Sequence, residues 1–415
     1  MLKQKKYLFY ATPALPLALL GLPLYVYLPT YYAQDVGLGV FVVGAILLLT
    51  RVLDMFLDPL IGYYSDRFGY YSDRYASRKS MMFFGMLLLL TGFYFLTNPS
   101  INADAWWLLL FSILVYFGWS LMTIPYLAFG ADLGQDYKEN SSYASYREVF
   151  NILGVLLALI LPYALNVADK ADESLALMNQ VIFLLLPLLF LFFVLSTKNQ
   201  HIKKRQQNFK VFYVSFVQHL KKSRHLFGAF LLNNFANAIP ATLFLLYVEF
   251  VIGSVEQTGL LLILYFLAGI MGLPFWNYVA SKTSKKHAWI YSMTSASFFF
   301  AFVPFLGAGD FNAFLFITIF TGFSLGADMA LPASIQADVA QEAKKEVSGT
   351  LFGFFAMLTK LALALGVGVS FGILGLFEFS TENPSEDSLL VLSLLYALLP
   401  IALKVVAILM LHRFK

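Results

Sequence analysis

Three charged residues stand close together inside an apolar stretch of the sequence. Arg51, Asp54 and Asp58 fall in "RVLDMFLDPLIGYYSDRFG", residues 51–69, and on a helix they share one face within an arc of about 60°. A carboxylate in an apolar interior is costly unless it is paired, hydrated or bound to a cation. Two carboxylates one turn apart therefore predict a cation site, or a site whose proton affinity is raised by mutual repulsion. A structural pair of Arg51 with one aspartate is the alternative, but one arginine cannot neutralise both acids.

Other polar residues inside apolar stretches are candidate contacts for a solute. Lys360, in "GFFAMLTKLALALGVG", is a lone cation that could be a counter-ion for the aspartates or could contact a solute. Arg147, in "SSYASYREVFNILG", could contact a solute or could anchor a helix end at the membrane surface. Asp328 could face a cavity or make a hydrogen bond between helices. Lys404 is explained by snorkelling of its long side chain.

The elements that must position these residues are membrane-spanning helices. The chain is 60% hydrophobic and only 13% charged, whereas a soluble domain carries about a quarter charged residues. Apolar runs of about 20 residues, the length that crosses a bilayer, recur throughout. They predict an all-α polytopic membrane protein with twelve transmembrane helices, at 9–33, 38–62, 79–98, 106–131, 142–165, 175–196, 225–252, 258–281, 287–308, 311–337, 347–377 and 387–412.

The positions of the basic residues predict the orientation of the chain. Lys170 is the one lysine or arginine in the connections on the side of the first loop, while most of the 28 lie at the termini or in the alternate connections. Because basic loops stay in the cytoplasm, both termini are expected there, with the chain multi-pass in the cell (inner) membrane. The net charge of +4 is then a topology signal, and no nucleic-acid partner is implied.

The longest polar break divides the helices into two sets of six. It predicts an N-terminal half at 1–196, a basic cytoplasmic linker at 197–224 and a C-terminal half at 225–415. The second helices of the two halves share a weak pattern, "DPLIGYYSDR" against "LPFWNYVASK". Two such repeats, with a solute held between them near the middle of the membrane, are a transporter architecture.

The residue inventory argues against an enzyme. The chain has no cysteine, and its five histidines fall in or beside polar connections, so no nucleophile–base or metal constellation is expected within the spans. There is no nucleotide-binding loop, and we expect no cofactor other than a coupling ion. We expect a monomer that contacts a small solute, a coupling cation and the bilayer. A sensor or scaffold that does not transport remains an alternative of a different class.

The loop that follows the second helix suggests a gate. In "YYSDRFGYYSDRY", residues 63–75, Asp66 and Arg67 can pair across the helix ends and latch one state, although a solvated loop would need no role. We also assign Arg51 to gating.

Two motifs resemble a known group of transporters. Gly62-x-x-x-Asp66-Arg67-x-Gly69 resembles the loop signature of the major facilitator superfamily. Arg51-x-x-Asp54-x-x-x-Asp58-Pro59 resembles the glycoside–pentoside–hexuronide:cation symporter family, typified by the melibiose carrier. Further matches are "AQDVGL", "IPYLAFGADLGQDYKENSSYASYR" and "GTLFGFFAMLTKLALALG", so the resemblance covers nearly all 415 residues.

The resemblance implies roles for individual residues. It makes Asp54 and Asp58 the site of Na⁺, Li⁺ or H⁺, and it puts Arg147 and Lys360 near the substrate. The chain departs from the sugar carriers where they have an aspartate in helix one, an aspartate before the helix-four proline and a tryptophan after it. These positions are Leu19, Thr123 and Leu127 here.

The departures affect the expected ligands. Thr123 occupies the position of the family's second sugar-gripping aspartate, which can also bind the cation. We therefore include Thr123 in the expected cation site. Leu19, Leu127, the neighbouring Tyr126 and Asp328 complete the expected substrate contacts.

The resemblance implies a function as well as a fold. It implies a cation-coupled (Na⁺ or H⁺) symporter of a small solute, a sugar or glycoside-like compound, that works by alternating access. Because two sugar-gripping acids are missing, a carrier of a lysophospholipid or another amphiphile on the same fold is the alternative.

Overall fold

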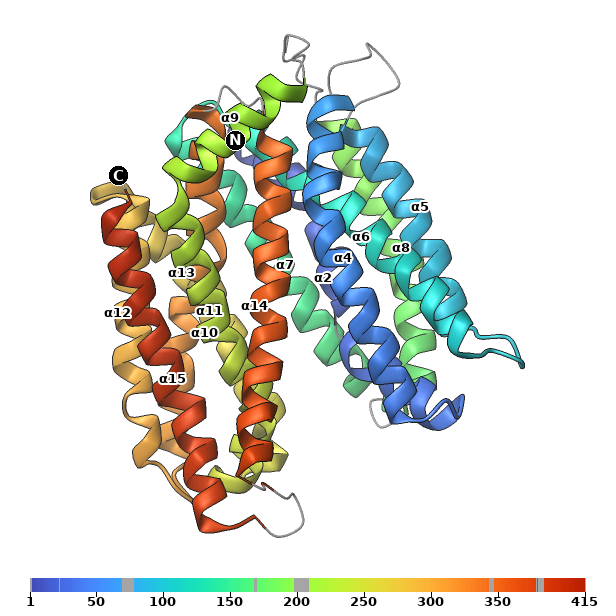
Figure 1. The fold of residues 1–415 in the computed structure, drawn as a ribbon, viewed down its shortest axis with the longest axis vertical. Coiled ribbons are helices and arrows are strands. Elements are labelled where there is room, and N and C mark those ends of the chain that lie inside the picture. Colours follow the sequence, from blue (N-terminus) through green and yellow to red (C-terminus); the bar gives the residue numbers. More distant parts are fainter. Residues whose placement is uncertain are drawn as a thin grey trace. The chain divides into compact units, whose positions relative to one another are not determined.

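The structure is a computed structural model, and every regular element in it is a helix (Figure 1). It describes residues 2–21, 23–68, 78–167, 170–197, 209–342, 347–377, 379 and 384–414. The second "YYSDR" copy, Gly69 of the loop signature and residues 198–208 of the predicted linker lie outside these ranges.

The first predicted span is a broken helix, because proline lacks the N–H that a continuous helix needs. Pro13 separates α1 from α2, and Pro23 begins a π-helical turn. The helices have these bounds: α1 Leu2–Ala11, α2 Ala14–Leu19, η1 Pro23–Tyr27, α3 Leu28–Thr30, η2 Tyr31–Asp35, α4 Val40–Phe68, α5 Arg78–Thr97, α6 Ala105–Leu133, α7 Tyr137–Ala164, α8 Ala171–Ser196, α9 Phe209–Lys222, α10 Arg224–Tyr247, η3 Val248–Ile252, η4 Val255–Gln257, α11 Thr258–Lys282, α12 Lys285–Phe300, η5 Val303–Phe305, α13 Phe311–Glu342, α14 Ser348–Leu376 and α15 Glu386–Arg413.

The helices match the predicted spans. In the described residues, 11 helical stretches are long and apolar enough to cross a membrane. The second predicted span, outside that set, is α4, a helix of 29 residues that carries Arg51, Asp54 and Asp58. The expectation of an all-α polytopic membrane protein is therefore confirmed.

The chain forms two compact units. The first comprises Met1–Phe216 and Gln336–Met357, and the second comprises Val217–Ile335 and Leu358–Lys415. The boundaries fall inside α9, α13 and α14, so the first turns of α14 pack with the first unit. The division of the sequence at 197–224 stays a prediction.

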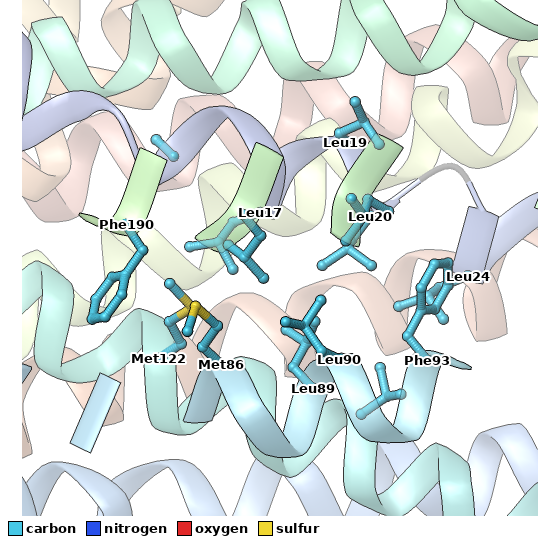
Figure 2. Close-up of a cluster of buried hydrophobic side chains, with 14 of the residues drawn as sticks. Leu17, Leu19, Leu20, Leu24, Met86, Leu89, Leu90, Phe93, Met122 and Phe190 are labelled. Carbon is cyan, nitrogen blue, oxygen red and sulfur yellow. The ribbon is translucent and has the colours of Figure 1, made fainter. Parts of the chain in front are cut away.

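The core of the first unit is apolar. Leucines of the broken first span pack against α5, α6 and α8 (Figure 2). Residues of this core include Leu17, Leu20, Leu24, Met86, Leu89, Leu90, Phe93, Met122 and Phe190. It fixes the helices that surround the charged face of α4.

Two backbones touch where α4 meets the start of α14. A side chain at Gly62 would collide with the carbonyl oxygen of Gly349, and one at Gly353 would collide with the carbonyl oxygen of Asp58. Small residues four apart let helices approach closely in membranes. This contact brings the backbone of Asp58 directly against α14.

The second unit has its own core around α10, α13 and α15. Tyr247 and Tyr396 stack with ring centroids 4.3 Å apart, and Phe314 packs beside them. Close contacts of Gly272, Gly322 and Gly326 hold α11 against α13. The unit thereby encloses a set of polar side chains described below.

Candidate functional site

The two aspartates of α4 lie side by side in the interior of the first unit. Asp54 and Asp58 are one turn apart, and only 3% and 0% of their surfaces are exposed. The hydroxyl of Ser120, on α6, donates a hydrogen bond of 2.9 Å to Oδ1 of Asp54. Two buried carboxylates and a hydroxyl offer oxygen atoms, the ligands that hard cations prefer.

The cluster of Asp54, Asp58 and Ser120 offers only a few oxygen atoms as ligands. Among the described residues, no three histidine, aspartate or glutamate side chains gather as metal ligands. The cluster therefore does not resemble a resident transition-metal centre, which uses several such ligands. It fits a proton or a weakly held alkali cation, which hydroxyl and carbonyl oxygens can also bind.

Arg51 is held by aromatic rings. Its guanidinium lies 4.4 Å from the ring centroid of Tyr25 and 4.1 Å from that of Tyr116, which are cation–π distances. Among the described residues, the buried Nη2 of Arg51 has no hydrogen-bond partner. Both the alternative of a structural Arg51–aspartate pair and the gating role of Arg51 stay predictions.

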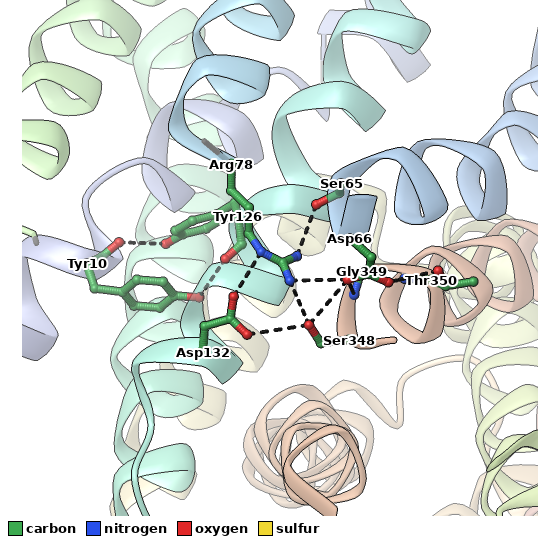
Figure 3. Close-up of polar contacts among 9 residues, drawn as sticks. All are labelled: Tyr10, Ser65, Asp66, Arg78, Tyr126, Asp132, Ser348, Gly349 and Thr350. Atoms are coloured by element: carbon green, nitrogen blue, oxygen red, sulfur yellow. Dashed lines mark hydrogen bonds and ion pairs between the residues drawn. The ribbon is translucent and has the colours of Figure 1, made fainter. Parts of the chain in front are cut away.

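Asp66 binds the first turn of α14. Its carboxylate accepts hydrogen bonds from the backbone N–H groups of Gly349 (2.6 Å) and Thr350 (2.7 Å) and from the Thr350 hydroxyl (2.8 Å), as Figure 3 shows. The first N–H groups of a helix lack partners within the helix, and the helix dipole favours a negative charge there. Asp66 thus acts as a cap for α14, supplied by α4.

The cationic partner of Asp66 is Arg78, the first residue of α5. Arg78 forms ion pairs of 3.2 Å with Asp66 and 2.9 Å with Asp132, and it donates a hydrogen bond of 2.7 Å to the Ser348 hydroxyl. We call Asp66, Arg78, Asp132, Ser348, Gly349 and Thr350 the Asp66 network (Figure 3). The predicted pairing of Asp66 with Arg67 is wrong in this structure, because the exposed Arg67 donates its hydrogen bond to Tyr63.

Arg147 and Tyr126 lie in a separate polar cluster of the first unit. Arg147 is buried and forms an ion pair with its neighbour Glu148, with Nε donating at 2.9 Å. Tyr126 stacks on Tyr10 at 4.8 Å and donates a hydrogen bond of 2.9 Å to the Tyr10 carbonyl (Figure 3). The charge of Arg147 is therefore neutralised within its own helix, and its contact with a substrate stays a prediction.

Three other predicted residues make packing or local contacts. Leu19 is fully buried in the apolar core that Figure 2 draws. Leu127 packs against Ala128, Ala131, Ala337 and Phe352. The Thr123 hydroxyl donates a hydrogen bond of 2.9 Å to the Trp119 carbonyl of its own helix. Their assignment to ligand binding stays a prediction, and these contacts do not require it.

Two predicted residues belong to the second unit. Lys360 is a half-buried residue of α14. Asp328, on α13, accepts hydrogen bonds from Trp289 Nε1 (2.8 Å) and Asn237 Nδ2 (3.0 Å) and forms an ion pair with Lys404 at 3.2 Å. The Asp328 carboxylate thus interacts with one donor from each of three other helices.

Lys404 does not snorkel. It is 7% exposed, and besides its ion pair it donates a hydrogen bond of 2.7 Å to Asn233 on α10. The interpretation of Lys404 as a surface-seeking lysine is therefore wrong, because Asp328 and Asn233 supply partners inside the unit.

Comparison with known proteins identifies the group to which this chain belongs. The family described as MFS/sugar transport protein matches residues 9–415. The chain belongs to this family.

Named relatives of this MFS family member are symporters. The sodium-dependent lysophosphatidylcholine symporter 1 of Gallus gallus is 20% identical over 97% of this chain and 85% of its own length. An uncharacterised symporter of Synechocystis is 28% identical, but the match spans 35% of this chain and only 28% of that protein.

Solved structures share the fold of this MFS chain. The transporter FucP in its outward conformation matches with a TM-score of 0.68 and 14% identity, over 99% of this chain and 98% of that one. A bacterial homologue of the iron transporter ferroportin, outward-facing with soaked iron, matches with a TM-score of 0.71 and 13% identity over the same shares. The predicted major facilitator fold is confirmed, and these neighbours and relatives are transporters rather than enzymes.

Two functional candidates in this MFS protein escaped the sequence analysis. Ser120 gave no signal, because a serine in an apolar run does not reveal which helix it faces. The position of Arg78 at the start of a helix was a signal, because a cation there is unfavourable unless an acid compensates it. That rule could have led from Arg78 to Asp66 and Asp132.

Proposed function

We propose that this MFS protein is a cation-coupled symporter of a small solute, with the cation bound at Asp54 and Asp58. The observation that carries the proposal is the pair of buried carboxylates on α4, one turn apart, with the Ser120 hydroxyl 2.9 Å from Asp54. Ionisable residues inside membrane helices are rare and commonly mark ion pathways. The two named symporter relatives add support.

The proposed cycle follows from the energetics of the buried acids. A cation at Asp54 and Asp58 offsets charge that would otherwise oppose closure around the site. An ion or solute shifts the carrier between states only if it binds one state more tightly than the other. We place both termini in the cytoplasm, on the basis of the basic connections, with the chain in the cell (inner) membrane.

We infer that the solute is a sugar or glycoside-like compound. The family description, MFS/sugar transport protein, supports this class. A lysophospholipid or another amphiphile is the second candidate. It is favoured by the relative that matches 97% of this chain and is described as a sodium-dependent lysophosphatidylcholine symporter.

We infer that the Asp66 network stabilises one state of the cycle. It ties α4, α5, α6 and the first turn of α14 together through one carboxylate and one guanidinium. In an alternating-access cycle the contact forms in one state and opens in the other.

Ser120→Ala should change cation affinity by about tenfold or more, and the direction separates the ions: loss of a hydroxyl oxygen ligand weakens Na⁺ or Li⁺ binding, whereas loss of the hydrogen bond to ionised Asp54 raises proton affinity. Hydrogen bonds to charged groups contribute about 1.5–3 kcal/mol, and the substitution removes the bond to Asp54 without adding volume. Cation titration of purified protein measures the change. Thr123→Val is the control, because the Thr123 hydroxyl bonds its own helix and its loss should leave the affinity unchanged. The reverse result would move the cation site from Ser120 toward Thr123.

Uptake by proteoliposomes tests the proposed function. Imposed Na⁺, Li⁺ or H⁺ gradients are combined with a panel of labelled sugars, glycosides and lysophosphatidylcholine. We expect one gradient to drive one solute class above its equilibrium concentration, and an ionophore that collapses the gradient to stop this. Downhill flux alone would exclude coupling. Binding without flux from a folded, monodisperse protein would favour a sensor or scaffold.

A further inference from the structure

The chain carries a basic amphipathic helix directly before a membrane span. Helix α9 ends at Lys222, and α10 begins at Arg224. The junction is short and ordered, since the Ser223 N–H donates to the His219 carbonyl at 2.9 Å and the Phe227 N–H donates to the Ser223 carbonyl at 3.0 Å. Because α10 crosses the membrane, this connection keeps α9 at the membrane surface.

One side of α9 combines apolar and basic residues. Tyr213, Val217 and Leu220 share a face at helical spacing. Tyr213 is 56% exposed and Val214 is 45% exposed. Lys221 lies two turns after Val214, at the edge of this face, and it is exposed as well. Tyrosine and lysine are the side chains that settle at the boundary between headgroups and acyl chains.

Another edge of the apolar face packs against protein. The rings of Phe216 and Phe354, at the start of α14, meet edge to face at 6.4 Å. The contact fixes the rotation of α9 about its axis. With this contact in place, Tyr213 and Val214 are still exposed.

The positive charge of residues 197–224 favours contact with anionic lipids. Residues 197–224 contain eight lysines and arginines and neither aspartate nor glutamate. Such clusters beside a membrane span attract acidic headgroups.

We propose that α9 is an interfacial helix that binds anionic lipid headgroups. Tyr213 enters the headgroup region, and Lys221, at the edge of the same face, contacts acidic phosphates. Through its junction at Ser223 and the Phe216–Phe354 contact, α9 then links the lipid surface to α10 and α14. The inference is independent of the solute and of the coupling ion.

The chain lacks cysteine, so a single introduced cysteine can be labelled selectively. Tyr213→Cys and Gln218→Cys carry a fluorophore on two exposed sides of α9, about 140° apart. The protein is placed in vesicles of phosphatidylcholine, with or without phosphatidylglycerol. A lipid-borne quencher at headgroup depth and aqueous iodide then report the depth of each label.

With phosphatidylglycerol we expect the label at 213 to be quenched by the lipid probe and shielded from iodide, and the label at 218 to stay accessible to iodide. Lys221→Glu/Lys222→Glu should lower the ratio of lipid-quenched to iodide-accessible label at 213 by about tenfold or more, as should high salt. Lys138→Glu, an exposed lysine outside α9, is the matched charge control and should change nothing.

Two results would overturn the proposal. Equal iodide access at 213 and 218 would show that α9 does not enter the headgroup region. Lipid quenching that is the same without phosphatidylglycerol, and unaffected by the double charge reversal in protein that remains monodisperse, would exclude recognition of acidic lipid.

Discussion

Asp58→Asn should abolish cation-driven accumulation of the solute while the protein stays folded. The amide keeps the shape of the side chain but removes a negative charge from a site with 0% exposure. Loss of one partner from a buried charge interaction costs about 3–5 kcal/mol, so cation affinity should fall by roughly 100-fold or more. Uphill uptake into proteoliposomes measures the loss.

Exchange transport controls for loss of the solute site, and a matched variant controls for a general effect of replacing an aspartate by asparagine. Exchange of labelled for unlabelled solute, which needs no gradient, should persist in Asp58→Asn if the solute site is intact. Asp172→Asn changes an exposed aspartate on α8 and should accumulate solute as the parent does. Undiminished uphill uptake by Asp58→Asn would remove Asp58 from the coupling site.

Lys404→Met should destabilise the second unit by about 3–5 kcal/mol. The substitution leaves Asp328 buried with Trp289 and Asn237 but without its cationic partner. The double variant Asp328→Asn/Lys404→Met should recover most of the loss, because replacing both partners of a buried pair leaves no uncompensated charge. Unfolding in detergent, followed by temperature or denaturant, measures both effects.

The same pair of variants tests the predicted role of Asp328 at the substrate. If the pair serves only to join α10, α12, α13 and α15, the stable double variant should transport normally. If Asp328 contacts the solute, the double variant should be folded and inactive. A single variant as stable as the parent would contradict the energetic account of the ion pair.

Helix number and the charged face of α4 could be predicted from the sequence. Apolar length locates the 11 spans found among the described residues, and the spacing of Arg51, Asp54 and Asp58 puts these three on one face of α4. Both inferences use distances along one helix, which the 3.6-residue turn determines.

Contacts between helices could not be predicted in the same way. Adjacent residues on a helix point about 100° apart, so Asp66 and Arg67 diverge, and Arg78 comes back to Asp66 only because α5 packs beside α4. Lys404 likewise contacts residues of α10 and α13, and the sequence around Lys404 does not reveal these contacts. The cation–π position of Arg51 depends on Tyr25 and Tyr116, from two other helices.

Thermal unfolding of the purified protein across Na⁺, Li⁺ and pH tests the central claim most directly. A cation that binds only the folded state at 100 times its Kd adds about 2.7 kcal/mol of stability. We predict that Na⁺, Li⁺ or a change of pH raises the unfolding temperature, and that Asp58→Asn removes this response. Identical responses of the parent and Asp58→Asn to all three would contradict a cation site at Asp54 and Asp58.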